Sequence, residues 1–203
     1  MSSILKVDEI QDTSGNNIIN ENANTVTIGK SGDTVNVIGT LQNGGTNFLQ
    51  GITMADQWRI TANTAGGDGV VSTNWERNDS NGYGSIGTGM TESSGVFTLP
   101  STGIYLIIAT IRIQVDASDT SASVQLQITE NNSTFNERAR MSGGNGSATA
   151  QVLTATNMFL FDVTDTTTHK FRMDKDGFAA GTFLAGNTDY QATGFTVLRL
   201  GDT

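Results

Sequence analysis

The chain has 203 residues, of which 36% are hydrophobic and 15% are charged, and it contains 24 glycines, one proline and no cysteine. This length fits one domain with an appendage and suffices to bury a hydrophobic core. The net charge of −9 at pH 7 argues against an electrostatic grip on nucleic acid or on an anionic membrane. The lack of cysteine excludes a disulfide framework and thiolate catalysis.

The first ten residues, MSSILKVDEI, lack the basic start and the apolar core of a signal peptide. No segment approaches the roughly eighteen consecutive apolar residues of a membrane-spanning helix. We therefore expect a soluble protein that is made in the cytoplasm and does not insert into a membrane.

Residues 1–45 contain a short repeat. The segments NTVTI (24–28) and DTVNV (33–37) are near copies of each other. A constant nine-residue spacing separates Ile10, Ile19, Ile28 and Val37. Since each copy is too short to bury its own apolar side chains, it has to stack on something. The copies form either a small hairpin or the rungs of an intertwined β stalk, and we assign residues 1–45 to an N-terminal β attachment or stalk segment.

The stretch LKVDEIQDTSGNNII (5–19), followed by TVTIGKSGDTV (25–35), resembles the N-terminal segments of tail-fibre-like structural proteins of marine bacteriophages. This resemblance implies a virion protein whose N-terminal segment attaches it to other virion proteins. The paired glycines of LQNGGT (41–46) break regular structure. We therefore expect a linker there and a second domain over residues 46–203.

Residues 46–203 consist of short segments rich in Thr, Ile and Val that are separated by Gly, Asn, Asp and Ser. This pattern is typical of many short strands, and no segment shows an apolar stripe of helical period. In chain order the predicted strands lie within 57–61, 70–77, 95–115, 122–129, 135–141, 151–163, 168–173 and 194–200. About ten strands at this spacing predict an all-β fold, a jelly-roll β-sandwich.

The longest apolar run lies in GVFTLPSTGIYLIIATIRIQV (95–115). Alternate residues of a strand point to opposite faces of its sheet. One set is apolar throughout and comprises Tyr105, Ile107, Ala109, Ile111, Ile113 and Val115. The other set is apolar at Ile104, Leu106 and Ile108 and becomes polar from Thr110. We expect the first half of this strand to be covered on both faces, by the core of the domain on one and by a neighbouring subunit on the other.

Phe97, Gly103 and Tyr105 form the pattern F-x5-G-x-Y, which resembles the core signature of the globular head of complement component 1q and its relatives. The run GIYLIIA (103–109) is similar to the corresponding strand of tumour necrosis factor. The resemblance implies a ten-stranded jelly roll that assembles as a homotrimer, with Phe97 and Tyr105 in its core. The side chains that would point towards the threefold axis are Ile104, Leu106 and Ile108.

Candidate catalytic groups are few. The single histidine, His169, lies on the same side of a predicted strand as Phe171 and Met173, which favours a core or interface residue over a catalytic base. A pair of carboxylates could serve a tail-spike glycan hydrolase, the alternative from another functional class. The Gly-, Ser- and Asn-rich surroundings of the acids instead favour turn formers that bond their own backbone. These acids are Asp56, Asp68, Asp79, Asp116, Asp119 and Glu130. We expect no enzymatic activity.

The segment DKDG (174–177) resembles the beginning of a calcium loop, but it lacks the third acidic ligand and has Ala185 in place of the closing glutamate. Calcium occurs near the trimer apex in relatives of the complement head, so a calcium-dependent lectin-like module is an alternative to a plain Asp-Gly turn. Trp58 and Trp75 are interpreted as core residues rather than as a platform for sugars. The glycines of GSIGTG (84–89) have no surrounding βα unit and form no dinucleotide loop.

The sequence thus favours a non-enzymatic virion structural protein, a bacteriophage tail fibre or appendage, with a trimeric C-terminal head. Loops on a rigid β scaffold commonly supply the binding function of such a head. The loops expected to contact a host-surface glycan or protein are 78–89, 142–147 and 178–189. A capsid decoration protein is the alternative within the same class, and no cofactor is expected.

Overall fold

The computed structural model describes residues 9–11, 13–14, 17–22, 25–28, 31–38, 42–43, 46–47 and 51–203. The chain divides by its internal packing into two compact units, Met1–Leu49 and Gln50–Thr203. We refer to the first as the N-terminal unit and to the second as the head. The remaining residues, which include part of the expected linker 41–46 and part of the phage-like stretch 5–19, lie outside the described residues.

The N-terminal unit contains two small antiparallel sheets. Strands β1 (Glu9–Gln11), β2 (Asn17–Asn22) and β3 (Thr25–Ile28) form one, and β4 (Gln42–Asn43) and β5 (Thr46–Asn47) form the other. The register places Ile10 opposite Ile19 and Ile19 opposite Ile28, so the nine-residue spacing becomes a row across the first sheet. The second near copy, 33–37, is exposed and outside any strand, because it has no neighbouring strand in the described part of this unit.

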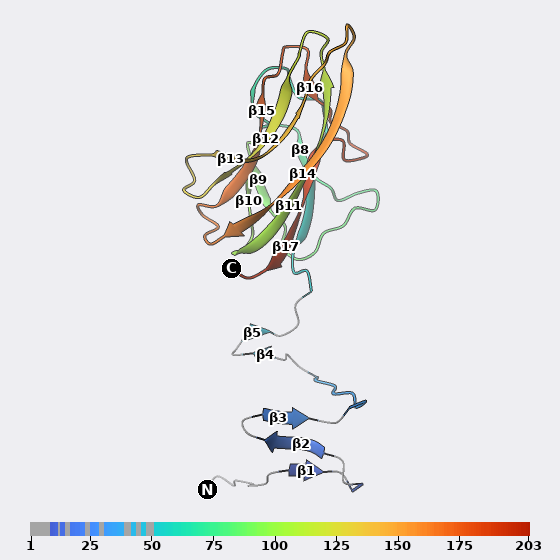
Figure 1. The fold of residues 1–203 in the computed structure, drawn as a ribbon, viewed down its shortest axis with the longest axis vertical. Coiled ribbons are helices and arrows are strands. Elements are labelled where there is room, and N and C mark those ends of the chain that lie inside the picture. The colour runs from blue at the N-terminus through green and yellow to red at the C-terminus, as the bar shows by residue number, and fades with distance from the viewer. Residues whose placement is uncertain are drawn as a thin grey trace. The chain divides into compact units, whose positions relative to one another are not determined.

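The head is a sandwich of two antiparallel sheets (Figure 1). One sheet has the order β14-β11-β17-β6-β8, with β16 beside β11, and the other has the order β13-β12-β15-β10-β9, with β7 beside β15. The strands are β6 (Ala55–Ile60), β7 (Gly69–Val70), β8 (Trp75–Arg77), β9 (Thr91–Ser93), β10 (Val96–Thr98), β11 (Gly103–Val115), β12 (Ala122–Thr129), β13 (Asn136–Gly143), β14 (Gln151–Val163), β15 (Lys170–Asp176), β16 (Phe183–Leu184) and β17 (Gly194–Gly201). The predicted all-β jelly-roll sandwich is therefore confirmed. The described residues include no helix that is long and apolar enough to cross a membrane.

Strand β11 is an interior strand of its sheet, between β14 and β17, and follows the predicted alternation. Its odd-numbered residues are buried and its even-numbered residues are half-buried along all 13 positions. The buried set faces the second sheet, where Phe97 of β10 lies at the centre of an aromatic cluster. The ring centroid of Phe97 is 4.5 Å from that of Phe195 and 5.3 Å from that of Phe171. Trp58 and Trp75 pack edge-on against Phe97 at 5.3 and 5.0 Å, as core residues do.

Two predicted strands differ from the structure. Residues 70–77 are split, because β7 pairs with β15 in one sheet and β8 pairs with β6 in the other. The chain crosses between the sheets at a turn in which Asn74 has a φ of +66°, a conformation that Asn tolerates better than most residues. The alternation of apolar and polar residues over 122–129 predicts a strand with one wet face, yet the outward residues Ser123 and Gln127 of β12 are also buried.

The arginines of the neighbouring strands are the reason for this burial on β12. Arg140 Nη1 donates to Ser123 Oγ at 2.8 Å, and Arg172 Nε donates to Gln127 Oε1 at 2.8 Å. Long side chains of this kind cover neighbouring surface with their aliphatic stems while the charged end stays near water. The outward side of β12 is thus shielded from solvent by side chains of β13 and β15.

The chain enters the head at the same end at which it terminates. The chain arrives at β6 beside the end of β17, since the Arg199 N–H donates to the Met54 carbonyl oxygen at 2.9 Å. The C-terminus is at the same end of the head (Figure 1). Strand β11 starts there, with Ile104 paired to Gly201, and its last residue, Val115, lies about 40 Å away at roughly 3.4 Å per residue. We call the end that contains Val115 the far end of the head.

Candidate functional site

The three signature residues lie where the chain turns from one sheet into the other. Phe97 and Tyr105 are fully buried, and the Tyr105 hydroxyl donates to the Ser101 carbonyl oxygen at 2.9 Å. Gly103 has a φ of +145°, and a Cβ there would lie 2.5 Å from the Gly201 carbonyl oxygen. The glycine therefore permits β11 and β17 to approach each other, while the tyrosine hydroxyl holds the turn before β11.

The even-numbered residues at the start of β11 share the outward side of their sheet with apolar residues of both neighbouring strands. Leu106 pairs with Leu160 of β14 and with Leu198 of β17, and Ile108 pairs with Met158 of β14. In the single chain, Leu160 and Met158 are 62% and 57% exposed, and the others are half-buried. We call this set the apolar face, and its members are Ile104, Leu106, Ile108, Met158, Leu160 and Leu198.

The apolar face ends at polar residues on both sides. Beyond Ile108 the hydroxyl oxygens of Thr110 and Thr156 are 3.2 Å apart, and at the other side Asp162 is the register partner of Ile104. A contiguous apolar patch with a polar rim is typical of a surface that another molecule covers. The structure thus gathers the three residues predicted for the trimer interface, and adds three that sequence reading did not connect to them.

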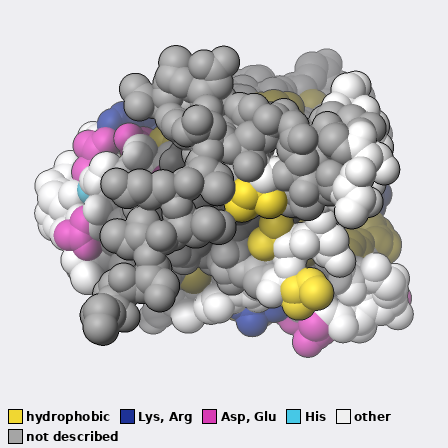
Figure 2. Space-filling view, turned by 90° about the horizontal axis from the view of Figure 1, so that it is seen from below, with side chains coloured by type: hydrophobic (Ala, Val, Ile, Leu, Met, Phe, Trp, Pro, Cys, Tyr) yellow, Lys and Arg dark blue, Asp and Glu magenta, His cyan; other side chains and the backbone are white. Residues whose placement is uncertain are grey.

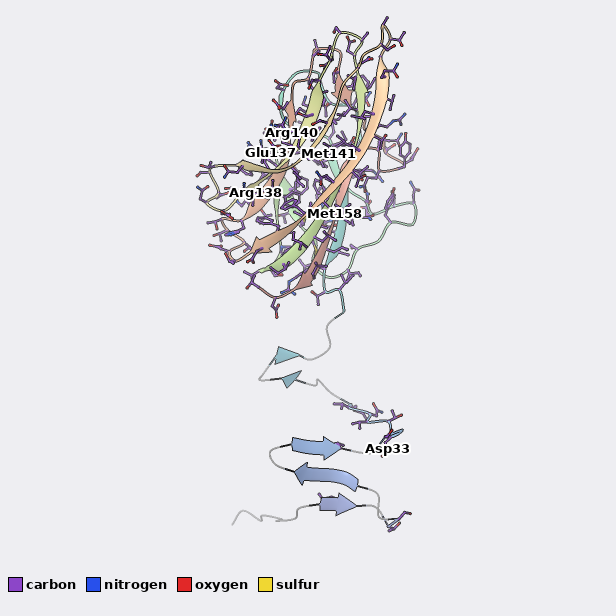
Figure 3. All side chains as sticks on the ribbon, in the orientation of Figure 1. Asp33, Glu137, Arg138, Arg140, Met141 and Met158 are labelled. Atoms are coloured by element: carbon purple, nitrogen blue, oxygen red, sulfur yellow. The ribbon has the colours of Figure 1, made fainter. Side chains whose placement is uncertain are left out.

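The outward side of the other sheet is charged. Arg140 of β13 donates to both carboxylate oxygens of Glu137 at 2.7 Å and to Asp176 of β15 at 2.6 Å; Figure 3 shows Glu137 and Arg140 on β13. These hydrogen bonds lower the pKa of Glu137 and of Asp176 and raise the pKa of Arg140. We call this set the charged face, and its members are Ser123, Gln125, Gln127, Glu137, Arg140, Arg172 and Asp176. In the view of Figure 2, acidic side chains are more prominent than basic ones, as the net charge requires.

Two of the three candidate loops, 142–147 and 178–189, reach the far end of the head. The glycine-rich sequence of 142–147 predicts a flexible loop, but Ser142 and Gly143 belong to β13. Asn145 is buried, and its Nδ2 donates to the carbonyl oxygens of Val115 at 3.3 Å and of Thr149 at 2.8 Å. A single buried amide therefore anchors this glycine-rich loop to the end of β11.

Asp119 anchors the second of these loops. Burial of Asp119 raises the pKa of its carboxyl group, but hydrogen bonds from the Ala179 N–H at 2.9 Å, the Thr182 hydroxyl at 2.7 Å and the Ser121 N–H outweigh burial and bring the pKa below its ordinary value. The nearby Asp116 accepts from the Ser118 hydroxyl and N–H, which also lowers its pKa. Asp116 thus forms a turn as predicted, whereas Asp119 connects two loops as well.

The third candidate loop, 78–89, lies away from the far end and is held by Asp56. The prediction that Asp56 forms a turn was wrong, because Asp56 is fully buried inside β6. Its carboxylate accepts from Arg77 Nε at 3.0 Å, from the Met90 N–H at 2.7 Å and from Trp58 Nε1 at 3.0 Å. The charge of Arg77 offsets the burial of this carboxylate, and the bonds from Arg77 and Met90 fix the two ends of the loop.

The remaining predicted chemical groups have ordinary surroundings. His169 is half-buried at the start of β15, with its ring stacked on Phe161 at 5.9 Å and its nitrogens 3.0 and 3.3 Å from two threonine hydroxyls. Asp174 and Asp176 belong to β15 rather than to a turn, and burial raises the pKa of Asp174. Within the described residues, no group of three or more acids and histidines has the arrangement of a metal site.

A pocket of about 210 Å³ opens on the outward side of β11, close to the far end. Its walls come from β11, β14 and β16, from the loop that follows β6 and from the loop that precedes β17. Within it, Arg112 Nη1 donates to the Tyr190 hydroxyl at 3.2 Å. We call it the distal pocket, and the side chains that define it are Asn63, Arg112, Gln114, Val152, Phe183 and Tyr190. Sequence reasoning missed it because these residues are far apart in the chain; the one signal was the change from apolar to polar residues along β11.

The sequence matches no protein-family model and no curated protein. Among solved structures, the crystal structure of murine APRIL at pH 5.0 is similar over 72% of this chain and 98% of its own length, with a TM-score of 0.55 and 12% identity. The structure of Eiger TNF from S. frugiperda is similar over 75% and 95%, with a TM-score of 0.56 and 12% identity. These similarities establish the fold: the head has the TNF-like jelly-roll architecture that the signature around Gly103 predicted.

Proposed function

We propose that the chain is a non-enzymatic binding protein whose head assembles as a homotrimer through the apolar face, and that it serves as a bacteriophage tail fibre or appendage. The observation that carries the trimer is the exposure of Leu160 and Met158 beside half-buried Leu106. Full burial of one such side chain contributes about 1.5–3 kcal/mol. Covering the whole patch therefore favours association strongly.

A second and third copy of the chain are the occupants that fit this surface. None of the six residues of the apolar face is charged, so this surface suits an apolar partner rather than one of complementary charge. Strand β14 is at the edge of its sheet, so a neighbour can contact Met158 and Leu160 from the side as well as from the face. The jelly rolls that the sequence resembles assemble as trimers with the strand that corresponds to β11 facing the threefold axis, which supports three copies rather than two.

The N-terminal unit supports the same assembly and the proposed attachment. Ile10 and Ile28, at the two ends of the isoleucine row, are 37% and 54% exposed. A sheet of three strands needs a covered apolar face to be stable in water, and in a trimer the corresponding units of three chains are held at high local concentration. We propose that these rows pack against one another and that the unit joins the chain to other virion proteins, as the resemblance of residues 5–19 suggests.

The native mass of the full chain tests the trimer. Light scattering during size exclusion should give about 64 kDa, three times the chain mass of 21.4 kDa. The same measurement after deletion of residues 1–49 locates the interface, since the head alone should still be trimeric because it carries the apolar face. A full-length monomer would contradict the trimer, and a monomer only after the deletion would move the assembly from the apolar face to the N-terminal unit.

The virion role is tested separately. Antibodies against the head should label purified particles of the phage that encodes the chain, at positions visible by electron microscopy. Label on fibres or appendages supports the proposal, and label over the capsid surface would favour a decoration protein instead. Particles without label, from a lysate that contains the free protein, would overturn the virion role while leaving the trimer intact.

A further inference from the structure

The distal pocket combines a cation that lacks an acidic partner with an aromatic wall. Each of Arg59, Arg77, Arg140, Arg172 and Arg199 pairs with a carboxylate. Arg112 pairs with none in the described part of the chain, and its side chain makes one hydrogen bond, to the Tyr190 hydroxyl. Arg112 as a whole residue is half-buried, and its guanidinium has unused donors, which suit the two oxygens of a carboxylate.

The other walls suit a small ring with hydroxyl groups. Tyr190, which is 48% exposed, and Phe183 offer aromatic surface, and Val152 adds an aliphatic side. Asn63 accepts from the Gly186 N–H through its Oδ1 at 3.1 Å, so both hydrogens of its amide remain available as donors. A few polar groups placed around aromatic and aliphatic surface are typical of a small-molecule site.

The distal pocket is preformed, because hydrogen bonds within the chain hold its walls in place. The Thr64 N–H donates to the Leu184 carbonyl oxygen at 3.0 Å, and the Leu184 N–H donates to Thr64 Oγ1 at 3.0 Å. The Ala185 N–H donates to the Arg112 carbonyl oxygen at 2.8 Å. Gly186 packs closely on the loop that follows β6, and a Cβ at this position would lie 2.2 Å from the Ala62 carbonyl oxygen. These contacts fix the walls, and a preformed site loses less affinity to ordering on binding.

The volume of the distal pocket and its position in the head limit the kind of ligand that it can bind. The volume of about 210 Å³ is below the roughly 300–1,000 Å³ of sites for drug-sized molecules, so the pocket fits one terminal unit of a larger molecule. It lies close to the far end of the head, away from the end where the chain arrives. We propose that the distal pocket binds a sugar unit that bears a carboxylate, with the carboxylate on Arg112 and the ring against Tyr190. This inference rests on the proposed role of the head as a surface-binding module.

Saturation-transfer NMR on the full chain tests the site with three probes at pH 7. Glucuronate carries both the ring and the carboxylate, glucose carries the ring alone, and acetate carries the carboxylate alone. We expect strong transfer to glucuronate and at least tenfold weaker binding of glucose and acetate. Equal binding of glucuronate and glucose would overturn the role of Arg112, and equal binding of glucuronate and acetate would overturn the sugar assignment.

Variants assign the binding to the pocket. Arg112→Gln should lower the affinity for glucuronate about tenfold or more, because a hydrogen-bonded charge pair is lost. Arg138→Gln is the matched control, since Arg138 also lacks an acidic partner among the described residues but lies exposed on β13, where it donates to the Glu137 carbonyl oxygen. Tyr190→Phe should retain binding and Tyr190→Ala should lose it. Unchanged glucuronate binding in Arg112→Gln would overturn the proposal.

The native mass of each sample separates this inference from the proposed trimer. A trimeric wild-type protein that shows no transfer to glucuronate would overturn the pocket and leave the assembly in place. Glucuronate binding by a monomeric chain would support the pocket and contradict the trimer.

Discussion

The outward sides of the two sheets in the head have opposite chemistry. On the charged face, Arg140 is paired with Glu137 and Asp176, and arginine side chains cover the interior strand β12. On the apolar face, the interior strand β11 is flanked by Leu160 and Met158, which are more than half exposed. The charged groups of the first surface are thus paired within the single chain, whereas the apolar side chains of the second remain partly exposed.

The two sheets differ in the chemistry of their outward residues and not in that of their inward residues. Both sheets have buried inward sides, so their inward residues do not distinguish them. The distinction lies in the outward positions of two corresponding interior strands: polar in Gln125 and Gln127 of β12, apolar in Leu106 and Ile108 of β11. An exposed apolar patch lowers solubility unless it is covered, and this is why we propose the interface on the side of β11.

The largest expected effect comes from a charge on the apolar face. Leu106→Asp should convert the trimer into a monomer of about 21 kDa or cause aggregation, because an unpaired carboxylate cannot be buried among leucines without a large cost. Light scattering measures the change. Thr98→Asp is the matched control, since Thr98 is an outward, half-buried residue of the other sheet beside its register partner Lys170. A stable trimer in Leu106→Asp would show that the interface lies elsewhere.

The next largest effect compares a buried with an exposed ion pair. Asp56 is completely buried and holds Arg77, whereas the carboxylate of Asp176, which holds Arg140, is half exposed. Asp56→Asn should lower the free energy of unfolding by about 3–5 kcal/mol, as breaking a buried pair does. Asp176→Asn should leave the melting temperature almost unchanged, because exposed pairs contribute little. Urea titration of both variants measures the difference, and equal losses would contradict this assignment of burial.

A smaller effect on stability is expected when the pH is lowered. Hydrogen bonds from Arg140 lower the pKa of Glu137 and of Asp176, so these groups stabilise the fold above their ordinary pKa of about 4 and lose that contribution as the pH falls through the lowered values. Asp174, whose pKa is raised by burial, acts in the opposite sense. The melting temperature should therefore fall below pH 4, and less steeply in Arg140→Gln. An identical acid limb in that variant would assign the loss to other carboxyl groups, such as those of Asp116 and Asp119.

The smallest expected effect is that of salt on the assembly. Sodium chloride at about 1 M screens the exposed pairs of the charged face but does not weaken contacts between apolar side chains. The mass measured by light scattering should stay near that of three chains, while the difference in melting temperature between wild type and Arg140→Gln should shrink. Dissociation at high salt would show that charged rather than apolar contacts hold the trimer together.

Local periodicity was enough to predict the long strands of the head. The burial of β11 alternates over its 13 residues and that of β14 over its last 12, and the glycine and tyrosine at the start of β11 carry a recognisable pattern. The predicted split between inward and outward residues of β11 holds along its whole length. Short segments were harder, because 70–77 reads as one strand although a turn at Asn74 sends its halves to different sheets.

Positions that depend on contacts between distant strands could not be predicted. Asp56 resembles a turn residue in the sequence, and no residue near it indicates that Arg77 and Met90 donate hydrogen bonds to its buried carboxylate. The distal pocket likewise needs the register between β11 and β14, which places Gln114 opposite Val152. The three predicted members of the apolar face were visible because they share one strand, and the other three follow from pairing alone.

The path by which the chain reaches the head has a mechanical consequence. Tension arriving through Gln50 acts first on β6, whose residues Ala55 to Arg59 pair with Leu198 to Gly194 of β17. The hydrogen bonds between antiparallel strands are perpendicular to the strand axis, so a pull along β6 loads all of these bonds together instead of opening them one after another. The head is therefore connected to the preceding chain through a strand whose hydrogen bonds resist shear, and a pull on residues before β6 should unfold the head only at high force.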